Sequence, residues 1–558
     1  MCGPVSPNRP SSNDRAREKY MIGADAIAEI LRRENTKFIA CYPRNGVIEA
    51  CARIGIRPIL CRQERIGVGM AEGYSRVHRG ARIGVFAAQA GPGIENTFPG
   101  VAQAHSDGMP ILVLTGAAAT GREHISPVFN AVDNFRHITK WATKINAAAQ
   151  IPDVFRRAYH LMRNGRPGPV LIEVPNDVWA QEIDDDFVYV PRARLMSAPD
   201  PGMIAEAVAV LKSAETPILW AGQGVLRAGA TDELVELAEW LNLPVMTTNP
   251  GKSGFPETHP LSLGGSVVSA PKPLKDYLHA ADWLFAIGSS LTLSPFNPNV
   301  PPGKSVIHAT NNADDINKDV PSEIGIVGDA KLVLAAMIDE IKKSVAEKPV
   351  MRRDVRAAKE VWLEEWADHL NSDEVPINQY RIVRDLMATV DRDNTIITHD
   401  SGSPREQLFP FWESTQPGGY MGWGKSTQLG HGLGITMGAK LAAPAKLCIN
   451  VMGDAAIGMV GMDIETAARN DIAILTIVLN NGVMAAERDT LLTSTEKYGA
   501  YLVGGNYRDF AIALGLDAFR AETAEEFIPA LKQAMNVTTG GAPALVECMV
   551  KEGYNFSR

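Results

Sequence analysis

The chain has 558 residues, of which 45% are hydrophobic and 21% are charged. These proportions are typical of globular proteins, and the length corresponds to roughly three to four domains of ordinary size. The net charge of −9 and the absence of a Lys/Arg cluster give no electrostatic basis for nucleic-acid binding. No apolar run reaches the roughly 18 residues of a membrane-spanning helix, so we expect neither nucleic acid nor membrane as a partner.

Residues 1–18 contain no hydrophobic stretch of the kind that a signal peptide requires. We therefore expect a disordered tail there. The cysteines are scattered and form no CxxC pair; they are Cys2, Cys41, Cys51, Cys61, Cys448 and Cys548. This pattern indicates a reduced, cytoplasmic chain without a disulfide framework or a zinc site.

From residue 19 to residue 195, short apolar runs alternate with helix-forming segments. Strands are expected at 37–41, 57–61, 82–87, 110–115 and 169–174, and helices at 21–33, 46–55 and 64–78. This alternation predicts a parallel, doubly wound α/β domain. The stretch that overlaps its end, residues 180–200, is acidic and then interrupted by prolines, which is typical of a linker.

A second α/β domain is expected at 201–345. Gly222, Gly224 and Gly288 lie in turns there, but their spacing is not G-x-G-x-x-G, which favours tight turns over an FAD site. Whether another nucleotide, such as ADP or CoA, binds this domain stays open. A third domain is expected at 370–558, after a charged helical connector, and it repeats the alternation of strands and helices seen in the first domain. The predicted fold class is therefore α/β, with three doubly wound parallel-sheet domains.

One stretch of the third domain has the pattern of a single βαβ unit. Apolar runs at 447–452 and 472–479 flank a helical segment at 459–469. Parallel strands joined by a right-handed crossover end at the same edge of the sheet, where such sheets bind ligands. Asp454 and Asn481 follow the two strands, so their carboxylate and amide oxygens would both reach one hard cation carrying a diphosphate.

This stretch, Gly-Asp followed at the second strand by Asn-Asn, resembles the diphosphate-binding signature of thiamine diphosphate enzymes. The resemblance implies thiamine diphosphate with Mg²⁺, the metal being held by Asp454, Asn481 and the carbonyl of Val483. The third residue of the usual Gly-Asp-Gly is Ala455 in this chain. Further cofactor contacts implied by the same stretch are Gly453, Ala455 and Met484.

The helix expected from Glu64 contains small residues that let another backbone approach closely: Gly67, Gly69, Ala71 and Gly73. Glu64 followed by MAEGYSR resembles the first-domain signature of the acetolactate synthase group. In that group this glutamate hydrogen-bonds N1′ of the aminopyrimidine and promotes the imino form that removes the C2 proton of the cofactor. The resemblance therefore implies that Glu64 activates the cofactor.

Three more runs match that group, namely QAGPGIENT, HDSGSPREQ and KSTQLGHGLG. They imply cofactor contacts by Gly91, Gly93, Gly402, Ser403, the backbone of Thr427, and Leu429. In the family the first domain of one subunit faces the third domain of another, so Glu64 and Asp454 would come from different chains. The implied assembly is a homodimer at minimum and a homotetramer by common example.

The resemblance to acetolactate synthases weakens near the substrate. Their Gly-Gly pair after Tyr-Pro is Arg44-Asn45 in this chain, and their Gly-Met-Val-x-Gln-Trp run is absent. Glu487 lies six residues after Asn481, where pyruvate decarboxylases carry a proton-handling glutamate, and is a candidate general acid. Asn130 is a candidate at the substrate border, and Arg44 is a candidate for holding a substrate carboxylate.

Three functions stay open on the sequence alone. The first is an enzyme that decarboxylates a 2-oxo acid, or ligates the resulting enamine to an aldehyde or ketone. The second is a 2-hydroxyacyl-CoA lyase or oxalyl-CoA decarboxylase, whose CoA pocket would use Lys272 and Lys275. The third is a non-catalytic regulatory homologue, against which the intact Glu64, Asp454 and Asn481 argue.

Overall fold

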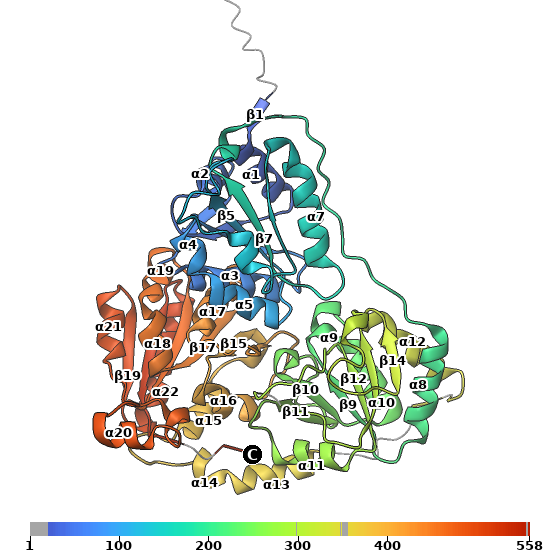
Figure 1. Ribbon diagram of the computed structural model, residues 1–558. Helices are drawn as coiled ribbons and strands as arrows, with labels where there is room; N and C mark the ends of the chain where they lie inside the picture. The colour runs from blue at the N-terminus through green and yellow to red at the C-terminus, as the bar shows by residue number, and fades with distance from the viewer. Residues whose placement is uncertain (1–19, 297, 346, 349–354, 554–555, 558) are drawn as a thin grey trace, which may run out of the picture.

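A computed structural model describes residues 20–296, 298–345, 347–348, 355–553 and 556–557. The expected tail at 1–18 and Cys2 lie outside these residues. Three six-stranded sheets form three domains, the first at the top of Figure 1, the central one at lower right and the third at lower left. Every strand pair within these sheets is parallel, as expected. An extended segment, residues 187–200, connects the first domain to the central one along the outside.

The first sheet has the strand order β3 (Arg57–Leu60), β2 (Phe38–Cys41), β4 (Gly84–Ala88), β5 (Ile111–Ala117), β7 (Val170–Pro175) and β6 (Trp141–Lys144). Its helices are α1 (Gly23–Arg33), α2 (Gly46–Arg53), α3 (Glu64–Val77), α4 (Pro92–Glu95), α5 (Phe98–Ser106), α6 (Ala131–Phe135) and α7 (Ile151–Arg163). Side chains alternate between the two faces of the sheet: Val85 packs with α1, α2 and α7, whereas Phe86 packs with α3 and α5. Both faces are therefore covered, as a parallel sheet requires.

The helix expected from residue 21 begins two residues later, at Gly23. The preceding residues form β1 (Tyr20–Ile22), which pairs antiparallel with β8 (Glu182–Asp184). This pair joins two segments far apart in the sequence, which is why local periodicity did not reveal it.

The central sheet has the order β11 (Ser262–Ser266), β10 (Val245–Thr248), β9 (Ile218–Ala221), β12 (Trp283–Ile287), β13 (Ser305–Thr310) and β14 (Ile324–Val327). Counted along the chain this is 3-2-1-4-5-6, the arrangement of dinucleotide-binding folds. Its helices are α8 (Pro201–Ser213), α9 (Gln223–Ala228), α10 (Thr231–Leu241), α11 (Lys272–Ala280) and α12 (Ala330–Lys342).

The third sheet has the order β16 (Tyr420–Met421), β15 (Thr395–His399), β17 (Leu447–Gly453), β18 (Ile474–Asn480), β20 (Ala544–Met549) and β19 (Asp517–Ala521). The connector and this domain contain α13 (Arg356–Glu365), α14 (Ala367–Leu370), α15 (Gln379–Thr389), α16 (Ser403–Phe411), α17 (His431–Ala442), α18 (Asp454–Val460), α19 (Ile464–Arg469), α20 (Leu492–Tyr498), α21 (Tyr507–Ala513) and α22 (Ala524–Thr539). Counted within each domain, the first and third sheets have the same order, 2-1-3-4-6-5. They are two copies of one architecture, as expected.

The predicted βαβ unit is present, but its crossover differs in detail. The helix begins at Asp454 instead of residue 459, and a 3-10 turn, η6 (Gly461–Asp463), separates α18 from α19. Gly461 lies at this break, where a Cβ would come within 2.9 Å of both Ile457 Cγ1 and Phe510 Cε1. Close packing at a residue of low helix propensity explains the interruption.

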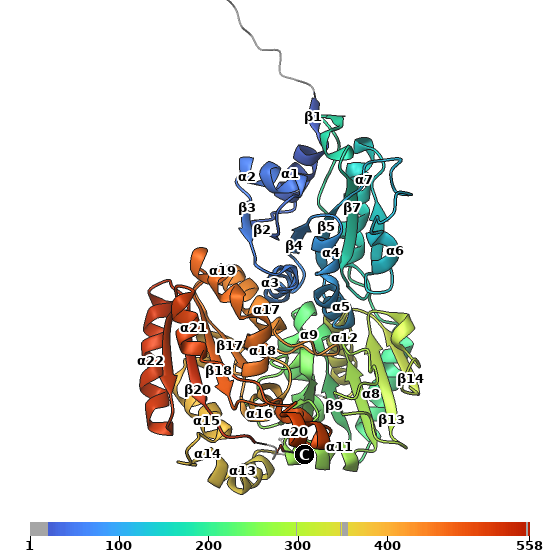
Figure 2. The same cartoon turned by 60° about the vertical axis from the view of Figure 1, so that its left-hand side comes forward.

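The first and third domains share one hydrophobic core, in which α3 lies along α17 (Figures 1 and 2). A Cβ on Gly73 would lie 2.1 Å from the carbonyl oxygen of Ile435, and one on Gly69 would lie 3.1 Å from the Cα of Gly434. The small residues of α3 therefore admit a neighbouring backbone, as expected. No helix among the described residues is long and apolar enough to cross a membrane.

Candidate active site

The ends of β17 and β18 meet at the carboxyl edge of the third sheet. The Asp454 carboxylate accepts hydrogen bonds from the backbone N–H groups of Asn481 (3.1 Å) and Gly482 (2.6 Å), and from that of Ala455 (2.7 Å). The Asn481 side-chain oxygen accepts from the N–H of Val483 at 3.1 Å. The expected proximity of Asp454, Asn481 and Val483 is thus present in the fold.

The charge of Asp454 is not balanced by a neighbouring cation. Its side chain is 3% exposed, and no Lys, Arg or His among the described residues lies within ion-pair distance. Burial raises the pKa of this carboxyl, although the adjacent backbone N–H groups act in the opposite direction. A buried carboxylate beside an amide oxygen is a donor set that suits a hard divalent cation, with other ligands completing its coordination. These residues therefore fit Mg²⁺.

The turn after β15 has room for an anion. Gly402 has φ +84°, and a Cβ at this position would meet no atom within 4 Å. Ser403 is the first residue of α16, so the free N–H groups of the first turn and the helix dipole favour negative charge there. Gly402 and Ser403 lie at the same sheet edge as Asp454 and Asn481, where they would contact a diphosphate bound there.

The turn before α17 is strained and firmly tethered. Thr427 has φ +48°, a conformation that costs a β-branched residue about 1–3 kcal/mol. Its carbonyl accepts the Ser401 hydroxyl at 2.8 Å. Leu429 is partly buried against the core shared by the first and third domains. The two residues implied to contact the aminopyrimidine thus lie on one fixed turn.

Asp400 connects this turn to the Gly402 turn. The sequence motifs did not predict Asp400 as a site residue. One carboxylate oxygen accepts from the N–H groups of Gly430 and Ser401, both at 2.8 Å, and the other accepts from Gly432 at 3.1 Å. Burial raises the pKa of Asp400 to about 6, while these three N–H groups act in the opposite direction. Its position directly after a strand of the binding edge was the available signal.

Glu64 is the first residue of α3 and is 5% exposed. Its carboxylate accepts a hydrogen bond from Asn96 at 3.2 Å. The two preceding N–H groups, of Arg62 and Gln63, donate to Asp463 in η6 at 2.7 and 3.0 Å. The start of α3 therefore lies against the segment that continues from Asp454 in the same chain. Whether Glu64 serves the Asp454 site of another chain stays a prediction.

The other first-domain candidates lie near the carboxyl edge of their sheet, Arg44 in the loop after β2 and Gly91 and Gly93 at the start of α4. Gly91 has φ +68° with open space around a Cβ, whereas a Cβ on Gly93 would meet the Gln89 side chain at 2.7 Å. Arg44 is exposed and has φ +67°. Arg44 therefore retains a left-handed backbone that suits glycine, the residue found there in acetolactate synthases.

The side chains of two candidates form no hydrogen bond to another candidate among the described residues. Asn130 is exposed and caps α6, where its side chain accepts from the N–H of Asp133. Glu487 is exposed in the 3-10 turn η7 (Ala485–Glu487) and accepts the Thr490 hydroxyl at 3.3 Å. The roles assigned to Asn130 and Glu487 stay predictions. Of the remaining candidates, Gly453 and Met484 flank the Asp454 and Asn481 turns.

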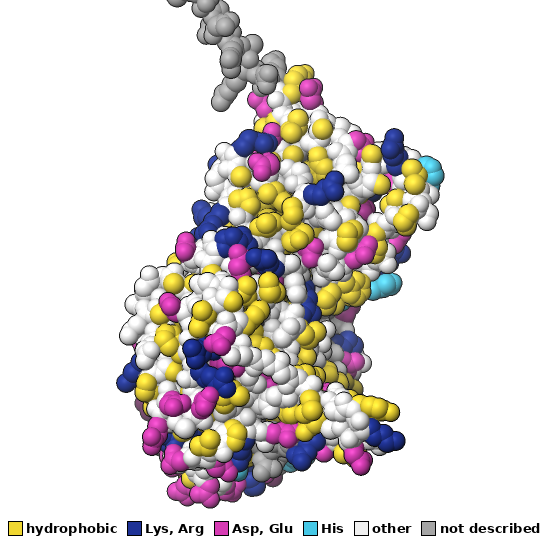
Figure 3. Space-filling model, turned by 90° about the vertical axis from the view of Figure 1, so that its left-hand side faces the viewer, with side chains coloured by type: hydrophobic (Ala, Val, Ile, Leu, Met, Phe, Trp, Pro, Cys, Tyr) yellow, Lys and Arg dark blue, Asp and Glu magenta, His cyan; other side chains and the backbone are white. Residues whose placement is uncertain are grey.

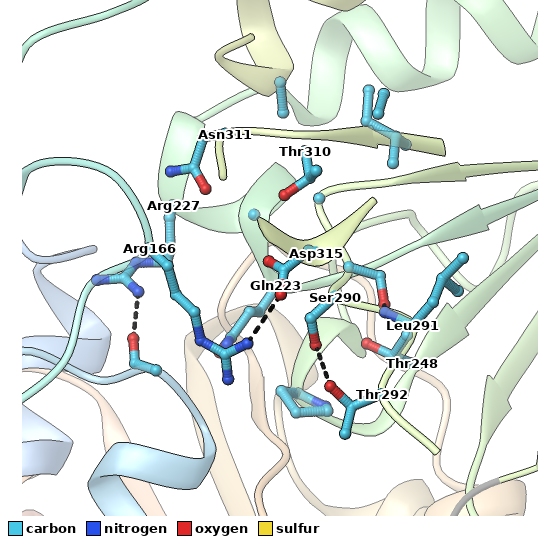
Figure 4. Close-up of a pocket in the computed structure, with 18 of the residues that line it drawn as sticks. Arg166, Gln223, Arg227, Thr248, Ser290, Leu291, Thr292, Thr310, Asn311 and Asp315 are labelled. Carbon is cyan, nitrogen blue, oxygen red and sulfur yellow. Dashed lines mark hydrogen bonds and ion pairs between the residues drawn. The ribbon is translucent and has the colours of Figure 1, made fainter. Parts of the chain in front are cut away.

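A cavity that the sequence did not reveal lies at the carboxyl edge of the central sheet (Figure 4). It has a volume of about 130 Å³, far more than the roughly 15 Å³ that one buried water needs. Residues of all three domains line it, among them Arg166, Gln223, Arg227, Ser290, Asp315 and Lys425. Its lining is basic on the side where the three domains meet.

Two cations of this lining are partly buried and have no carboxylate partner among the described residues. Arg227 donates to the Gly108 carbonyl at 2.5 Å, and Lys425 donates to the Ser290 hydroxyl at 2.9 Å. Burial, reinforced by nearby guanidinium groups, lowers the pKa of Arg227 to about 9, and burial with Arg166 lowers that of Lys425 to about 8. By contrast, Arg166 is paired with Asp315 at 3.3 Å (Figure 4).

Gly224 and Gly288 of the central domain line this cavity, and Gly222 packs against Gly288 beside it. A Cβ on Gly224 would lie 2.6 Å from the Cα of Gly288, and one on Gly222 would lie 2.3 Å from the Gly288 carbonyl oxygen. Lys272 does not line the cavity; it forms an exposed ion pair with Asp276 on α11 at 2.8 Å. The residues predicted to bind CoA are therefore not those of the basic lining.

Comparison with protein families agrees with this geometry. Three models match in chain order: the thiamine pyrophosphate enzyme N-terminal TPP binding domain at residues 21–145, the central domain at 204–337, and the C-terminal TPP binding domain at 400–548. The chain belongs to the thiamine pyrophosphate enzyme family. This result confirms the resemblance inferred from the sequence motifs.

Within that family the chain is acetolactate synthase-like. It is 31% identical over 552 residues to a probable acetolactate synthase large subunit of Methanococcus aeolicus, covering 92% of this chain and 90% of the relative. It is 28% identical to an acetolactate synthase isozyme 3 large subunit of Escherichia coli K12, with 83% of each chain covered. A glyoxylate carboligase of Escherichia coli O157:H7 is also 28% identical, over 90% of this chain and 88% of the relative. The chain is thus a thiamine diphosphate-dependent enzyme of the decarboxylase and carboligase type.

Proposed function

We propose that the chain uses thiamine diphosphate and Mg²⁺ to decarboxylate a 2-oxo acid and to ligate the resulting fragment to a second carbonyl compound. The observation that carries this proposal is the buried Asp454 carboxylate, which has no cationic partner among the described residues and lies beside Asn481 at the carboxyl edge of the third sheet. The relatives of this protein that are named acetolactate synthase and glyoxylate carboligase support the proposed class of reaction.

Each end of the cofactor has its own set of residues. Asp454, Asn481 and the Val483 carbonyl would hold the metal, and the Gly402–Ser403 turn would hold the diphosphate. When bound, thiamine diphosphate supplies a C2 carbanion that adds to a carbonyl. Glu64 would hold a proton at N1′, and its burial excludes the water that would compete for this hydrogen bond.

Substrate recognition is assigned to the edge residues of the two sheets. Arg44 would pair with the carboxylate of a 2-oxo acid, because its guanidinium offers donors in a fork that matches a carboxylate. Glu487 would act as a general acid once substrate or a neighbouring chain covers it, since burial raises the pKa of a carboxyl.

A substrate screen of the purified chain with thiamine diphosphate and Mg²⁺ tests this proposal. Pyruvate, longer 2-oxo acids, benzoylformate, a hydroxyacyl-CoA and aldehyde pairs are offered, and CO₂ and ligation products are measured. We expect turnover of a 2-oxo acid that falls about 100-fold or more in Glu64→Gln. Glu525→Gln, an exposed change on α22, is the matched control. Turnover of the acyl-CoA alone would contradict the proposal.

We also propose a cytoplasmic homodimer or homotetramer. The five described cysteines are free and buried, which supports a reducing compartment. Hydrophobic side chains gather on the face shown in Figure 3, on both sides of the boundary between the first domain and the part below it. Exposed apolar residues where the first and third domains meet include Leu60, whose carbonyl accepts from Arg469, and Met459, whose carbonyl accepts from Gln63. Light scattering tests the assembly, and a monomer at micromolar concentration would contradict it.

A second binding function is proposed for the central cavity, which we assign to an anionic, phosphate-bearing ligand such as a nucleotide. Two partly buried cations that have no carboxylate partner among the described residues favour this assignment, because an anion would offset their desolvation. Calorimetric titration with ADP tests it: we expect binding that weakens about tenfold or more in Arg227→Met. Lys532→Met, an exposed change on α22, should have no effect. Absence of ADP binding by the wild type would remove a nucleotide as the occupant.

A further inference from the structure

A buried chain of polar side chains runs from the first domain into the turn that precedes α17. Arg76 donates to Asp107 at 2.7 Å and to Glu72 at 2.8 Å. Glu72 in turn pairs with His431 at 2.9 Å. The Glu72 and His431 side chains are fully buried and lie 359 positions apart in the sequence. These polar side chains therefore connect α3 to the start of α17 through Glu72 and His431, which are shielded from water.

The last of these connected polar side chains is Gln428, which lies between Thr427 and Leu429. Its amide nitrogen is 2.7 Å from Nδ1 of His431. Burial opposes ionisation of Glu72, but Arg76 and His431 outweigh it and lower the pKa of this carboxyl to about 2. Glu72 can therefore only accept, so Nε2 of His431 carries a proton toward Glu72, and Nδ1 is the ring atom that faces the Gln428 amide nitrogen. The amide nitrogen of Gln428 is thus directed toward His431.

The orientation leaves the amide oxygen of Gln428 directed away from His431. That oxygen is buried and has no hydrogen-bond partner among the described residues. Buried acceptors are nearly always satisfied in native structures. The neighbouring Thr427 carbonyl already accepts one hydrogen bond, from Ser401. A buried free acceptor in a turn otherwise held in place indicates that a donor from a bound group completes it.

The same first-domain residues tether the rest of the turn. Arg76 donates to the Gly422 carbonyl at 2.9 Å, and Asp107 accepts from the N–H groups of Gly424 and Lys425, both at 3.3 Å. The Trp423 ring packs edge-on against His431, with 5.1 Å between centroids. These contacts belong to, or are held by, Arg76, Asp107 or Glu72, so the conformation of the turn depends on the first domain as well as on Ser401 and Asp400.

We propose that Gln428 is a positioning residue for the aminopyrimidine of the cofactor, and that His431, Glu72 and Arg76 hold it in place from the first domain. The inference rests on the proposed binding of thiamine diphosphate at this turn. Loss of these polar side chains would misplace the Thr427 carbonyl and Leu429, the two residues implied to contact the aminopyrimidine. The metal and the diphosphate would be held by Asp454, Asn481 and the Gly402 turn, to which none of these polar side chains is hydrogen-bonded among the described residues.

The test is the rate at which the C2 proton of bound thiamine diphosphate exchanges with deuterated water, measured by NMR after acid quench. The cofactor affinity in the presence of MgCl₂ is measured in parallel by calorimetry. Gln428→Met and His431→Phe are expected to slow exchange about tenfold or more, because a small misplacement of a reacting group is costly. Affinity should stay within about threefold, since the metal and diphosphate contacts remain. His431→Asn, which keeps an acceptor near the place of Nδ1, should recover part of the rate.

Ser75→Ala is the matched control, because Ser75 is buried on the same helix but bonds Gly84 within the first domain. It should lower stability and leave exchange unchanged. Unchanged exchange in Gln428→Met, or an equal loss in Ser75→Ala, would overturn the inference. A wild type that binds no thiamine diphosphate would instead overturn the proposed function. Gln428 is only partly buried, so Gln428→Met folds even if the core variants do not.

Discussion

The Asp454 carboxylate accepts a hydrogen bond from the backbone N–H of Asn481 at 3.1 Å, across 27 positions of sequence. One side chain thus ties the ends of two adjacent parallel strands before any cofactor is bound. The residue implied to bind the metal also holds the loop that supplies the second metal ligand. Structure and binding at this edge therefore depend on the same carboxylate.

Asp454→Ala is expected to destabilise the cofactor-free chain by about 1–3 kcal/mol, because the N–H groups of Asn481 and Gly482 lose their acceptor. Asp454→Asn retains one acceptor oxygen and should cost less. Urea unfolding of both variants measures the difference. Equal stability of the wild type and Asp454→Ala would show that the carboxylate does not hold this loop.

Gly73→Ala is expected to destabilise the chain by about 3 kcal/mol, because a Cβ would lie 2.1 Å from the Ile435 carbonyl oxygen. The backbone of α17 cannot move aside without disturbing the core that the two domains share. Gly504→Ala is the control, since a Cβ there would meet no atom within 4 Å. Thermal unfolding that ranks the two variants equally would contradict the close packing of α3 on α17.

The sequence sufficed to predict the three parallel sheets, because each strand is an apolar run bounded by turn residues. It also placed Asp454 and Asn481 at one sheet edge, since strand ends of a βαβ unit must meet there. It could not reveal the pairing of Glu72 with His431 or the cavity around Arg227. This pairing and this cavity depend on how whole domains pack. The sequence around Glu72, His431 or Arg227 alone contains no motif that predicts them.

Arg44→Gly is expected to raise stability by about 0.5–1 kcal/mol, because glycine adopts a φ of +67° without strain and this gain exceeds its added unfolded-state entropy. If Arg44 binds a substrate carboxylate, the same change should raise KM for a 2-oxo acid about tenfold. Asp471→Gly, at φ +55° in an exposed turn, should gain stability with KM unchanged. A KM that stays constant in Arg44→Gly would remove Arg44 from substrate binding.

The pH dependence of stability should report the buried carboxyl of Asp463. Burial raises the pKa of this group from 3.8 to about 6, while the N–H groups of Arg62 and Gln63 act in the opposite direction. The folded chain binds this proton more tightly than the unfolded chain, so the contribution is complete below about pH 4 and is lost as the pH rises through about 6. The free energy of unfolding of the wild type minus that of Asp463→Asn should fall by about 2 kcal/mol between pH 4 and pH 7. A difference that rises over this range would have the wrong sign.

The central claim is that Asp454 and Asn481 hold a metal ion to which thiamine diphosphate is attached. Calorimetric titration of the purified chain with thiamine diphosphate, with and without Mg²⁺, tests it most directly. We predict saturable binding of one cofactor per chain that requires the metal, is lost on chelation, and weakens about 100-fold or more in Asn481→Ala. No binding by the wild type, or equal binding after removal of divalent metal, would contradict the claim.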